Sequence, residues 1–381
     1  AACVDVVAFR WLASGSAPDY RAIARFRKRH LSALGHVFVQ ALALCQAAGM
    51  VSLGRVALDG TKVRANASKR KAMSYARMTE KEKVLAAEVS ALLLEAERID
   101  KAEDQQFGKD RRGDELPAEL ARRETRLVKI RQAKAALEHE AAEAARADAE
   151  RKARERDDDD DTTTSAGAAA AAAATPKPKA QRNFTDPDSK IMLTADGAFH
   201  QCYNAAAVVD ADHQVIVATA VGTNAADVGT LLPMTRQAAA NTGRVPAQVL
   251  ADAGYSSAAN CEAAAAYTAT YGTEFFIAPG RRRRDDPAPV APRGRIPADA
   301  TTKQRMARKL TTKRGQQVYA RRKAIVEPVF GQMSTLQNAK HLLLRGLEQA
   351  RGEWLLLAAC HNIRKLHGHI GLTGLSALPA Y

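Results

Sequence analysis

The stretch GRVALDGTKV, residues 54–63, carries the first sign of a β-sheet core. In it Val56 and Leu58 alternate with Ala57 and Asp59, which is the two-residue period of a strand with one buried face. An Asp-Gly pair follows and is a turn signal. The pattern therefore predicts a strand that ends at Asp59. It leaves open whether this acid does chemistry or is only a turn residue.

Four further β-rich runs follow later in the chain. CYNAAAVVD (202–210) and QVIVATAV (214–221) are joined by a short polar turn, which predicts a hairpin. AQVLADAGY (247–255) is an apolar run with Asp252 at its end, and TEFFIAP (273–279) gives the fifth strand. The order of these strands predicts an α/β fold with a mixed five-stranded sheet.

Helical periodicity marks the segments around these strands. Residues 1–54 carry apolar side chains at helical spacing and are expected to form a helical N-terminal segment. Further helices are expected over 227–241, from about 256 to 270, and over 303–366. These helices would flank the sheet.

Residues 67–182 interrupt this pattern. Two runs with dense mixed charge follow each other, and their apolar residues recur at heptad-like spacings, which predicts an antiparallel coiled-coil hairpin that turns near residues 108–117. Residues 157–180 combine an acidic run, a Thr run, poly-Ala and Pro-Lys repeats, and are predicted to be a disordered linker. The heptad positions are Met78, Leu85, Leu92 and Ile99 in the first run, and Leu116, Leu120, Leu127, Ile130 and Leu137 in the second.

The overall charge indicates an anionic partner. Lys and Arg number 57 against 42 Asp and Glu, which gives a formal net charge of +15 and favours nucleic acid or another anionic surface. No run of 18 apolar residues is present, so no membrane partner is expected. The five cysteines form no CxxC pair, which favours a reducing cytoplasm over a disulfide framework.

Three acids stand where carboxylates can meet. Asp59 and Asp252 end predicted strands, and Glu327 lies in the basic stretch VYARRKAIVEPVFGQ (318–332). Since Glu327 precedes Pro328, it is expected at a kink or a helix start. Two carboxylates on strand ends and a third on a following helix can converge at one edge of a sheet, where they suit Mg²⁺. Alternatively, Asp252 caps the next helix, and Glu327 is an acid in the first turn of its own.

Five ordered blocks resemble the Asp-Asp-Glu (DDE) transposases of bacterial insertion sequences. They are VALDGTKVRANASKRKAMSY, NFTDPDSKIM with YNAAAVVDADHQVIVA, LADAGYSS, YARRKAIVEPVFGQ, and LLLRGLEQARGEWLLLAACHNIRKL. Together they cover most of residues 5–366 except the predicted linker. The resemblance implies a ribonuclease-H-like core, with residues 55–381 as the catalytic domain around the insert and residues 1–54 as a truncated DNA-binding region.

The resemblance also implies site residues and partners. It makes Asp59, Asp252 and Glu327 catalytic ligands of two Mg²⁺ ions, for which Mn²⁺ can substitute, and it places Tyr319, Arg322 and Lys323 near DNA phosphates. The expected function is metal-dependent cleavage and strand transfer of an insertion sequence. The expected partners are double-stranded DNA at element ends and target, with the protein as a homodimer on paired ends, in the cytoplasm at the nucleoid.

Some residues leave alternatives open. Arg281, Arg282, Arg283 and Arg284 form either a solvated loop or a phosphate contact. Ser334 stands where the family usually has Lys or Arg. With the short N-terminal region, it motivates an alternative: an inactive transposase relic that only binds DNA. A third hypothesis is a nuclease that uses the same acids without strand joining.

Overall fold

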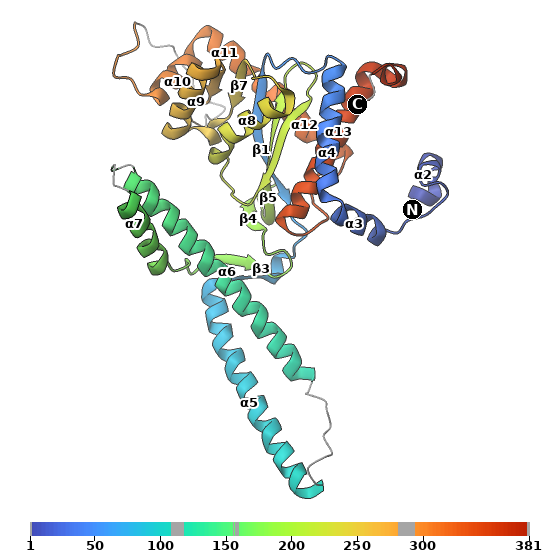
Figure 1. Ribbon diagram of the computed structural model, residues 1–381, viewed down its shortest axis with the longest axis vertical. Helices are drawn as coiled ribbons and strands as arrows, with labels where there is room; N and C mark the ends of the chain where they lie inside the picture. The colour runs from blue at the N-terminus through green and yellow to red at the C-terminus, as the bar shows by residue number, and fades with distance from the viewer. Residues whose placement is uncertain (1, 108–117, 155, 157–159, 281–293, 379–381) are drawn as a thin grey trace. The chain divides into compact units, whose positions relative to one another are not determined.

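The computed structural model describes residues 2–107, 118–154, 156, 160–280 and 294–378. The chain divides into two compact units (Figure 1). Unit 1 comprises Ala1–Asn66 and Ser189–Tyr381, and unit 2 is Ala67–Asp188. The segment predicted as an insert therefore belongs to a unit of its own.

A mixed sheet forms the centre of unit 1. β5 runs antiparallel to β1 and β6, whereas β7 and β8 run parallel to β1. Across the sheet the order is β6, β5, β1, β7, β8, and β4 pairs with the first residues of β5. This mixed α/β arrangement is compatible with a ribonuclease-H-like fold. The strands are β1 (Val56–Arg64), β4 (Lys190–Leu193), β5 (Phe199–Asp210), β6 (Ile216–Gly222), β7 (Gln248–Ala251) and β8 (Glu274–Ile277).

All five predicted strands are present, with two corrections. In the described residues the sheet has six strands, because β4, too short for a clear sequence signal, pairs with β5 through Lys190 to Leu193. β1 also does not end at Asp59. It continues to Arg64, since Gly60 keeps an ordinary extended backbone and every residue of β1 pairs with β5. The Asp-Gly pair is therefore not a turn.

Helices cover both faces of this sheet (Figure 1). Because side chains alternate along a strand, Val56 and Leu58 face one side, where they join a buried core with α4 and α8. Asp59 faces the other side, toward α12. The flanking helices are α4 (Leu31–Ala47), α8 (Leu231–Thr242), α9 (Ala258–Tyr271), α12 (Arg322–Leu336) and α13 (Leu347–Ser376), which is interrupted at Gly371.

The predicted N-terminal segment is helical in its described part. α4 packs against α13, and Leu42 and Cys45 of α4 belong to the main core. No helix among the described residues has the length and apolar character needed to cross a membrane. The remaining helices of unit 1 are α1 (Ala2–Asp5), α2 (Val7–Leu12), α3 (Tyr20–Arg29), η2 (Val228–Thr230), η3 (Ala253–Tyr255), α10 (Thr302–Thr311) and α11 (Lys313–Ala320).

Pro328 lies within a helix, so of the two expectations for this position, a kink or a helix start, the helix start is wrong. The proline lies inside α12, six residues after the first residue, Arg322. A proline in a helix leaves the carbonyl four residues earlier without its usual donor. Here the side-chain amide of Gln214 donates to the Ala324 carbonyl at 2.9 Å and replaces that hydrogen bond. Glu327 is therefore a residue of the helix body.

Unit 2 contains two long helices that run antiparallel. Tyr75 donates to Glu138, Lys134 pairs with Glu82, and Arg123 pairs with Glu88, so positions rise along one helix as they fall along the other. Between the helices lie seven buried apolar side chains: Met78, Leu85, Val89, Leu127, Ile130, Ala133 and Leu137. The side chains of Ile99, Leu116 and Leu120 and the predicted turn at 108–117 lie outside the described residues. The elements are η1 (Lys69–Lys71), β2 (Ala72–Ser74), α5 (Tyr75–Phe107), α6 (Ala118–Arg154), α7 (Asp160–Ala173) and β3 (Gln181–Asn183), which pairs with β2.

The disordered linker predicted over 157–180 is wrong for its central part. Residues 160–173 form helix α7, which packs on α6. Alanine has the highest intrinsic helix propensity, so a poly-Ala run favours a helix once a partner surface is available. Thr163 and Gly167 are buried, and Gly167 lies against Glu150 and Arg146 of α6. Low complexity here supports a close helix contact rather than disorder.

Candidate active site

Asp59 and Asp252 lie next to each other at the centre of the sheet. β1 and β7 are parallel neighbours, and Leu58 pairs with Ala251. The residue that follows each of these two is an aspartate, so the two aspartates are adjacent. Asp252 begins η3 and accepts the Gly254 N–H through Oδ1 at 2.9 Å. Asp252 therefore caps the short helical turn η3, whereas Ser257 caps the following α-helix, and Asp252 also stands beside Asp59.

Arg322 links Asp59 to Glu327. Its Nη1 donates to Asp59 Oδ2 at 2.7 Å, and its Nη2 lies 3.9 Å from Glu327 Oε1. The Arg322 side chain is 9% exposed and that of Glu327 is 55% exposed, so Glu327 reaches the pair from the solvent side. The three carboxylates predicted from the sequence are thus brought to one region of unit 1, with an arginine between the first and the third.

Burial and charge set the acidity of this region. Burial raises the pKa of the Asp59 carboxyl, the neighbouring Arg322 lowers it, and the charge of Asp252 raises it again. Burial also raises the pKa of the half-buried Tyr319, which lies near Arg322. Two carboxylates held together at the edge of a buried core repel each other, and a cation between them relieves that repulsion.

The residues predicted to contact DNA do not all lie on one helix. Tyr319 belongs to α11, which ends at Ala320, so it does not share a helix with Lys323 and Glu327. Lys323 is exposed, four residues before Glu327 on α12. Arg281, Arg282, Arg283 and Arg284 lie outside the described residues.

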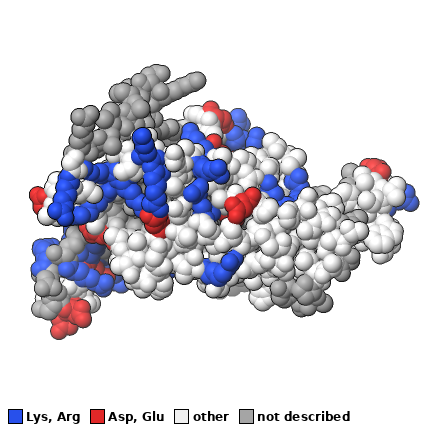
Figure 2. Space-filling model, turned by 90° about the horizontal axis from the view of Figure 1, so that it is seen from above, with Lys and Arg blue, Asp and Glu red and all other residues white. Residues whose placement is uncertain are grey.

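A basic surface adjoins these helices. Figure 2 shows Lys and Arg side chains gathered over the part of the face where α10 and α11 lie. The exposed members on these two helices are Lys303, Arg305, Lys313 and Arg314. Such a surface suits a phosphate backbone.

Four polar residues near the aspartates were not singled out from the sequence. Asp227 Oδ1 accepts from the side-chain amide of Asn204 at 2.6 Å and from Lys62 Nζ at 3.2 Å. Burial, followed by the charge of Asp227, raises the pKa of Tyr255, which is fully buried next to Asp252 in the chain. The only sequence signal for this group is that Lys62 follows Asp59 on the same strand.

The donor set fits a hard divalent cation in part. Carboxylate oxygens are the ligands that Mg²⁺ prefers, and Asp59 and Asp252 supply them side by side. Arg322 holds the positive charge at Asp59 in this arrangement. Among the described residues, no three Asp, Glu, His or Cys side chains are close enough to hold one ion together. Asp59 and Asp252 are thus the two residues best placed to hold a divalent cation. Glu327 is connected to Asp59 through Arg322.

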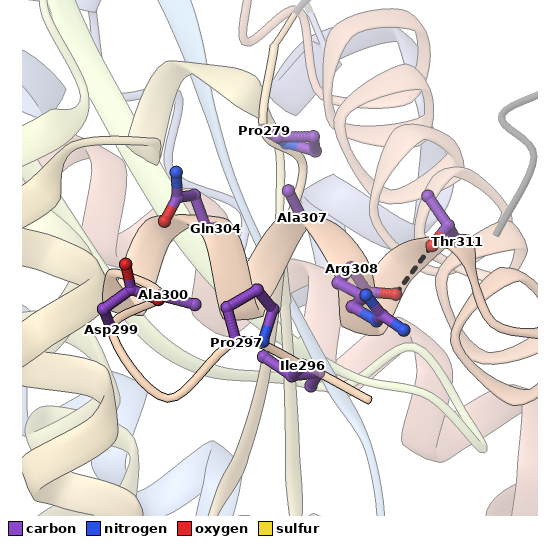
Figure 3. Close-up of a pocket in the computed structure, with 9 residues that line it drawn as sticks. All are labelled: Pro279, Ile296, Pro297, Asp299, Ala300, Gln304, Ala307, Arg308 and Thr311. Carbon is purple, nitrogen blue, oxygen red and sulfur yellow. Dashed lines mark hydrogen bonds between the residues drawn. The ribbon is translucent and has the colours of Figure 1, made fainter. Parts of the chain in front are cut away.

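A separate pocket of about 520 Å³ lies beside α10 (Figure 3). Pro279 and the segment that carries Ile296 and Pro297 border it, and Thr311 at the end of α10 donates to the Arg308 carbonyl at 2.7 Å. None of the described candidate residues lines this pocket. It is distinct from the carboxylate site.

One family model matches this region. Residues 295–367 match the model described as a transposase DDE domain, and this span contains Tyr319, Arg322 and Glu327. This match supports a DDE transposase of insertion-sequence type. Neither a comparison with curated proteins nor one with solved structures gives a match.

The matched domain supports a transposase function in broad terms. Transposition acts on DNA, and transposase DDE domains generally use divalent metal ions. The match lies in the part of unit 1 that carries α10, α11, α12 and most of α13. Asp59 and Asp252 precede it in the sequence and meet it through the contact between Asp59 and Arg322.

Proposed function

We propose that this transposase cuts DNA at the ends of its insertion sequence and joins the freed ends to target DNA. One observation carries the proposal: Asp59 and Asp252 stand side by side on neighbouring parallel strands, and Arg322 links Asp59 to Glu327 inside the matched transposase domain. A ribonuclease-H-like core is the architecture that fits this placement.

Asp59, Asp252 and Glu327 would hold two Mg²⁺ ions, or Mn²⁺ in their place. When bound, such ions activate a water or a 3′-hydroxyl and stabilise the oxygen that leaves the phosphodiester. The chain's own side chains orient the DNA. Arg322 and Lys323 are cations next to the carboxylates, and Tyr319 adds a hydroxyl beside Arg322. They suit the phosphates that flank the cut.

The rest of the chain would hold the substrate and the partner. The basic surface on α10 and α11, with the arginines at 281–284, would follow the DNA backbone of element ends and target. We propose that α5 and α6 form a coiled-coil arm, because their buried positions follow the heptad spacing of the sequence. This arm and residues 1–54 would serve a homodimer on paired ends. The predicted location is the cytoplasm, at the nucleoid.

The test is cleavage of a duplex that carries the ends of the element encoding this chain, with Mg²⁺ or Mn²⁺ and with a chelator. The parent should cut and join, whereas Asp59→Asn, Asp252→Asn and Glu327→Gln should each lose both activities. Glu348→Gln is a matched control, because Glu348 is an exposed acid that pairs with Arg351 of its own helix. Its activity should equal that of the parent.

The outcomes separate the alternatives. Full cleavage by Asp59→Asn with Mg²⁺ present would sink the proposed mechanism. Metal-dependent cutting without joined products would indicate a nuclease. Binding without cleavage by the parent would indicate a relic, and Ser334 would be the first position to replace with Lys.

A further inference from the structure

Lys62 is held in a polar cradle on β1. Its Nζ donates to Asn204 Oδ1 at 2.8 Å and to Asp227 Oδ1 at 3.2 Å. Asn204 is the residue directly opposite Lys62 on β5, and Asp227 comes from the segment before α8. The cradle therefore draws on three separate parts of unit 1. A lysine with a flexible four-carbon stem is fixed here by two partners.

One N–H of this ammonium remains available. An ammonium has three hydrogens to donate, and the two acceptors of the cradle take two of them. No third acceptor contacts Nζ among the described residues, and the Lys62 side chain is 21% exposed. Solvent or a ligand can thus reach the third N–H without breaking the cradle.

The edge of β1 is open at this position. The pairing of β7 with β1 extends only as far as Leu58. On that side of β1, the next backbone pairing among the described residues is between Arg64 and the segment at residue 341. The residues from Asp59 to Val63 therefore border a gap in the sheet, and Asp252 lies at its other side. Lys62 lies three residues beyond Asp59 on this stretch, so its side chain leaves the opposite face of β1, the face on which Gly60 meets Asp227.

The position of Asp227 depends on two glycines. A Cβ at Gly60 would lie 2.5 Å from Asp227 Oδ1, so the Asp227 carboxylate would have to shift to admit it. A Cβ at Gly254 would lie 3.0 Å from Asp252 Oδ1 and 3.6 Å from Asp227 Oδ2. Asp227 thus approaches the backbone directly beside Asp59 and shares the space over Gly254 with Asp252. Its carboxylate belongs to the same small region as the candidate catalytic acids.

We propose that Lys62 binds a DNA phosphate beside the catalytic carboxylates and that Asp227 and Asn204 are positioning residues that aim its ammonium. The identity of the ligand as DNA rests on the proposed function. A fixed, partly exposed cation at an open sheet edge suits one phosphate oxygen, through a charge-assisted hydrogen bond. The competing explanation is a salt bridge that only stabilises the fold.

The first test measures DNA affinity as a function of salt, with a chelator present so that no cleavage occurs. The probe is a fluorescein-labelled duplex carrying an element end, followed by anisotropy. Loss of one phosphate contact lowers the steepness of log Kd against log salt by about 0.9. Lys62→Met should show this decrease, and Lys62→Arg should retain the parental slope. Arg55→Gln is the control, because Arg55 adjoins the opposite end of β1 and pairs with Gln248.

The second test separates positioning from charge. Asp227→Asn removes a negative charge, so electrostatics alone predicts tighter DNA binding. The positioning role predicts binding several-fold weaker than in the parent, because the ammonium loses its charged partner. Tighter binding by Asp227→Asn would overturn the positioning role.

An unchanged salt slope in Lys62→Met, with a lowered melting temperature, would leave Lys62 a structural residue and overturn the proposal. If this variant does not fold, Lys62→Gln takes its place in the same comparison. Neither test requires cleavage. If the parent never cuts DNA, the proposed reaction is refuted and the proposed phosphate contact is unaffected. If the parent cuts DNA but Lys62→Met leaves the salt slope unchanged, the phosphate contact is refuted and the reaction is not.

Discussion

Gly60 owes its identity to a neighbouring carboxylate rather than to its own backbone. Its φ lies outside the left-handed region, so any residue could adopt its conformation. The constraint is space, because Asp227 Oδ1 occupies the place where a Cβ would project. Gly222, at the end of β6, also has an ordinary φ but has no atom within 4 Å of its Cβ position.

Gly60→Ala should therefore destabilise the protein, whereas Gly222→Ala should not. Overpacking of this kind typically costs about 1–3 kcal/mol. Replacing glycine where the backbone allows it is neutral or stabilises by up to about 1 kcal/mol. Urea unfolding of the two variants measures the difference. Equal stabilities would show that Asp227 moves aside freely, and that its position is not constrained by Gly60.

His361 should make stability depend on pH. Burial lowers the pKa of its imidazole from 6.5 to about 4, and the Gln214 carbonyl lies 2.9 Å from Nε2. Between these two pKa values the imidazole is protonated in the unfolded chain and neutral in the folded protein. The free energy of unfolding should then fall as the pH is lowered from about 6.5 toward about 4, by up to about 1.4 kcal/mol per pH unit. Urea titrations at several pH values measure this slope, and His361→Gln should flatten it.

At the scale of elements, the sequence predicts what depends on local pattern. One alternating stretch and four β-rich or apolar runs mark the five predicted strands of the core, and all of them are present. Short strands such as β4 are missed, because four residues carry too little periodicity. The helix start expected near Pro328 is wrong, since Gln214, more than a hundred positions earlier in the chain, supplies the hydrogen bond that the proline cannot donate. Such a contact leaves no trace in the local sequence.

The residues of the candidate site also fall into those that the sequence predicts and those that it does not. Asp59, Asp252 and Glu327 could be predicted as candidates because acids at the ends of predicted strands and in a following helical region stand in the order that resembles the family, although β1 continues past Asp59. Lys62, Asn204 and Asp227 could not, because their contact arises only when β1, β5 and the segment before α8 come together. A lysine on a half-buried strand is a weak signal by itself.

Helix α7 gives a direct test of the corrected linker. Ala169 is exposed in its middle, so Ala169→Pro should break the helix without removing a buried contact. Proline in a helix interior costs about 3 kcal/mol. Limited proteolysis should then cut within residues 160–173 in the proline variant, while Ala169→Ser stays resistant. Rapid cleavage of the parent at the same place would mean that the segment is unstructured.

At the scale of the molecule, each unit has a core of its own. The core of unit 1 is built on the sheet, and that of unit 2 lies between α5 and α6. Ile130 is 1% exposed in the second core. Damage there should therefore remain in unit 2.

Ile130→Ala should destabilise unit 2 by about 2–5 kcal/mol through loss of burial and a residual cavity. Hydrogen exchange should accelerate in α5 and α6 and remain unchanged in β1, β5 and β7. Leu58→Ala is the reciprocal control, since Leu58 is fully buried in the core of unit 1. Faster exchange throughout the chain in both variants would show that the two cores unfold as one.

The pairing of β2 with β3 has a consequence for how the chain folds. β1 and β5 pair along the whole of β1, although all of unit 2 separates them in the sequence. Closing so long a loop is slow, because its entropy must be lost before any contact compensates. β2 and β3 bring Ser74 next to Gln181, so a unit 2 that folds early leaves only short tethers between the two strands. Pulse-labelled exchange during refolding should show α5 and α6 protected before β1. Protection of β1 first would mean that unit 2 folds after the sheet and does not help to bring β1 and β5 together.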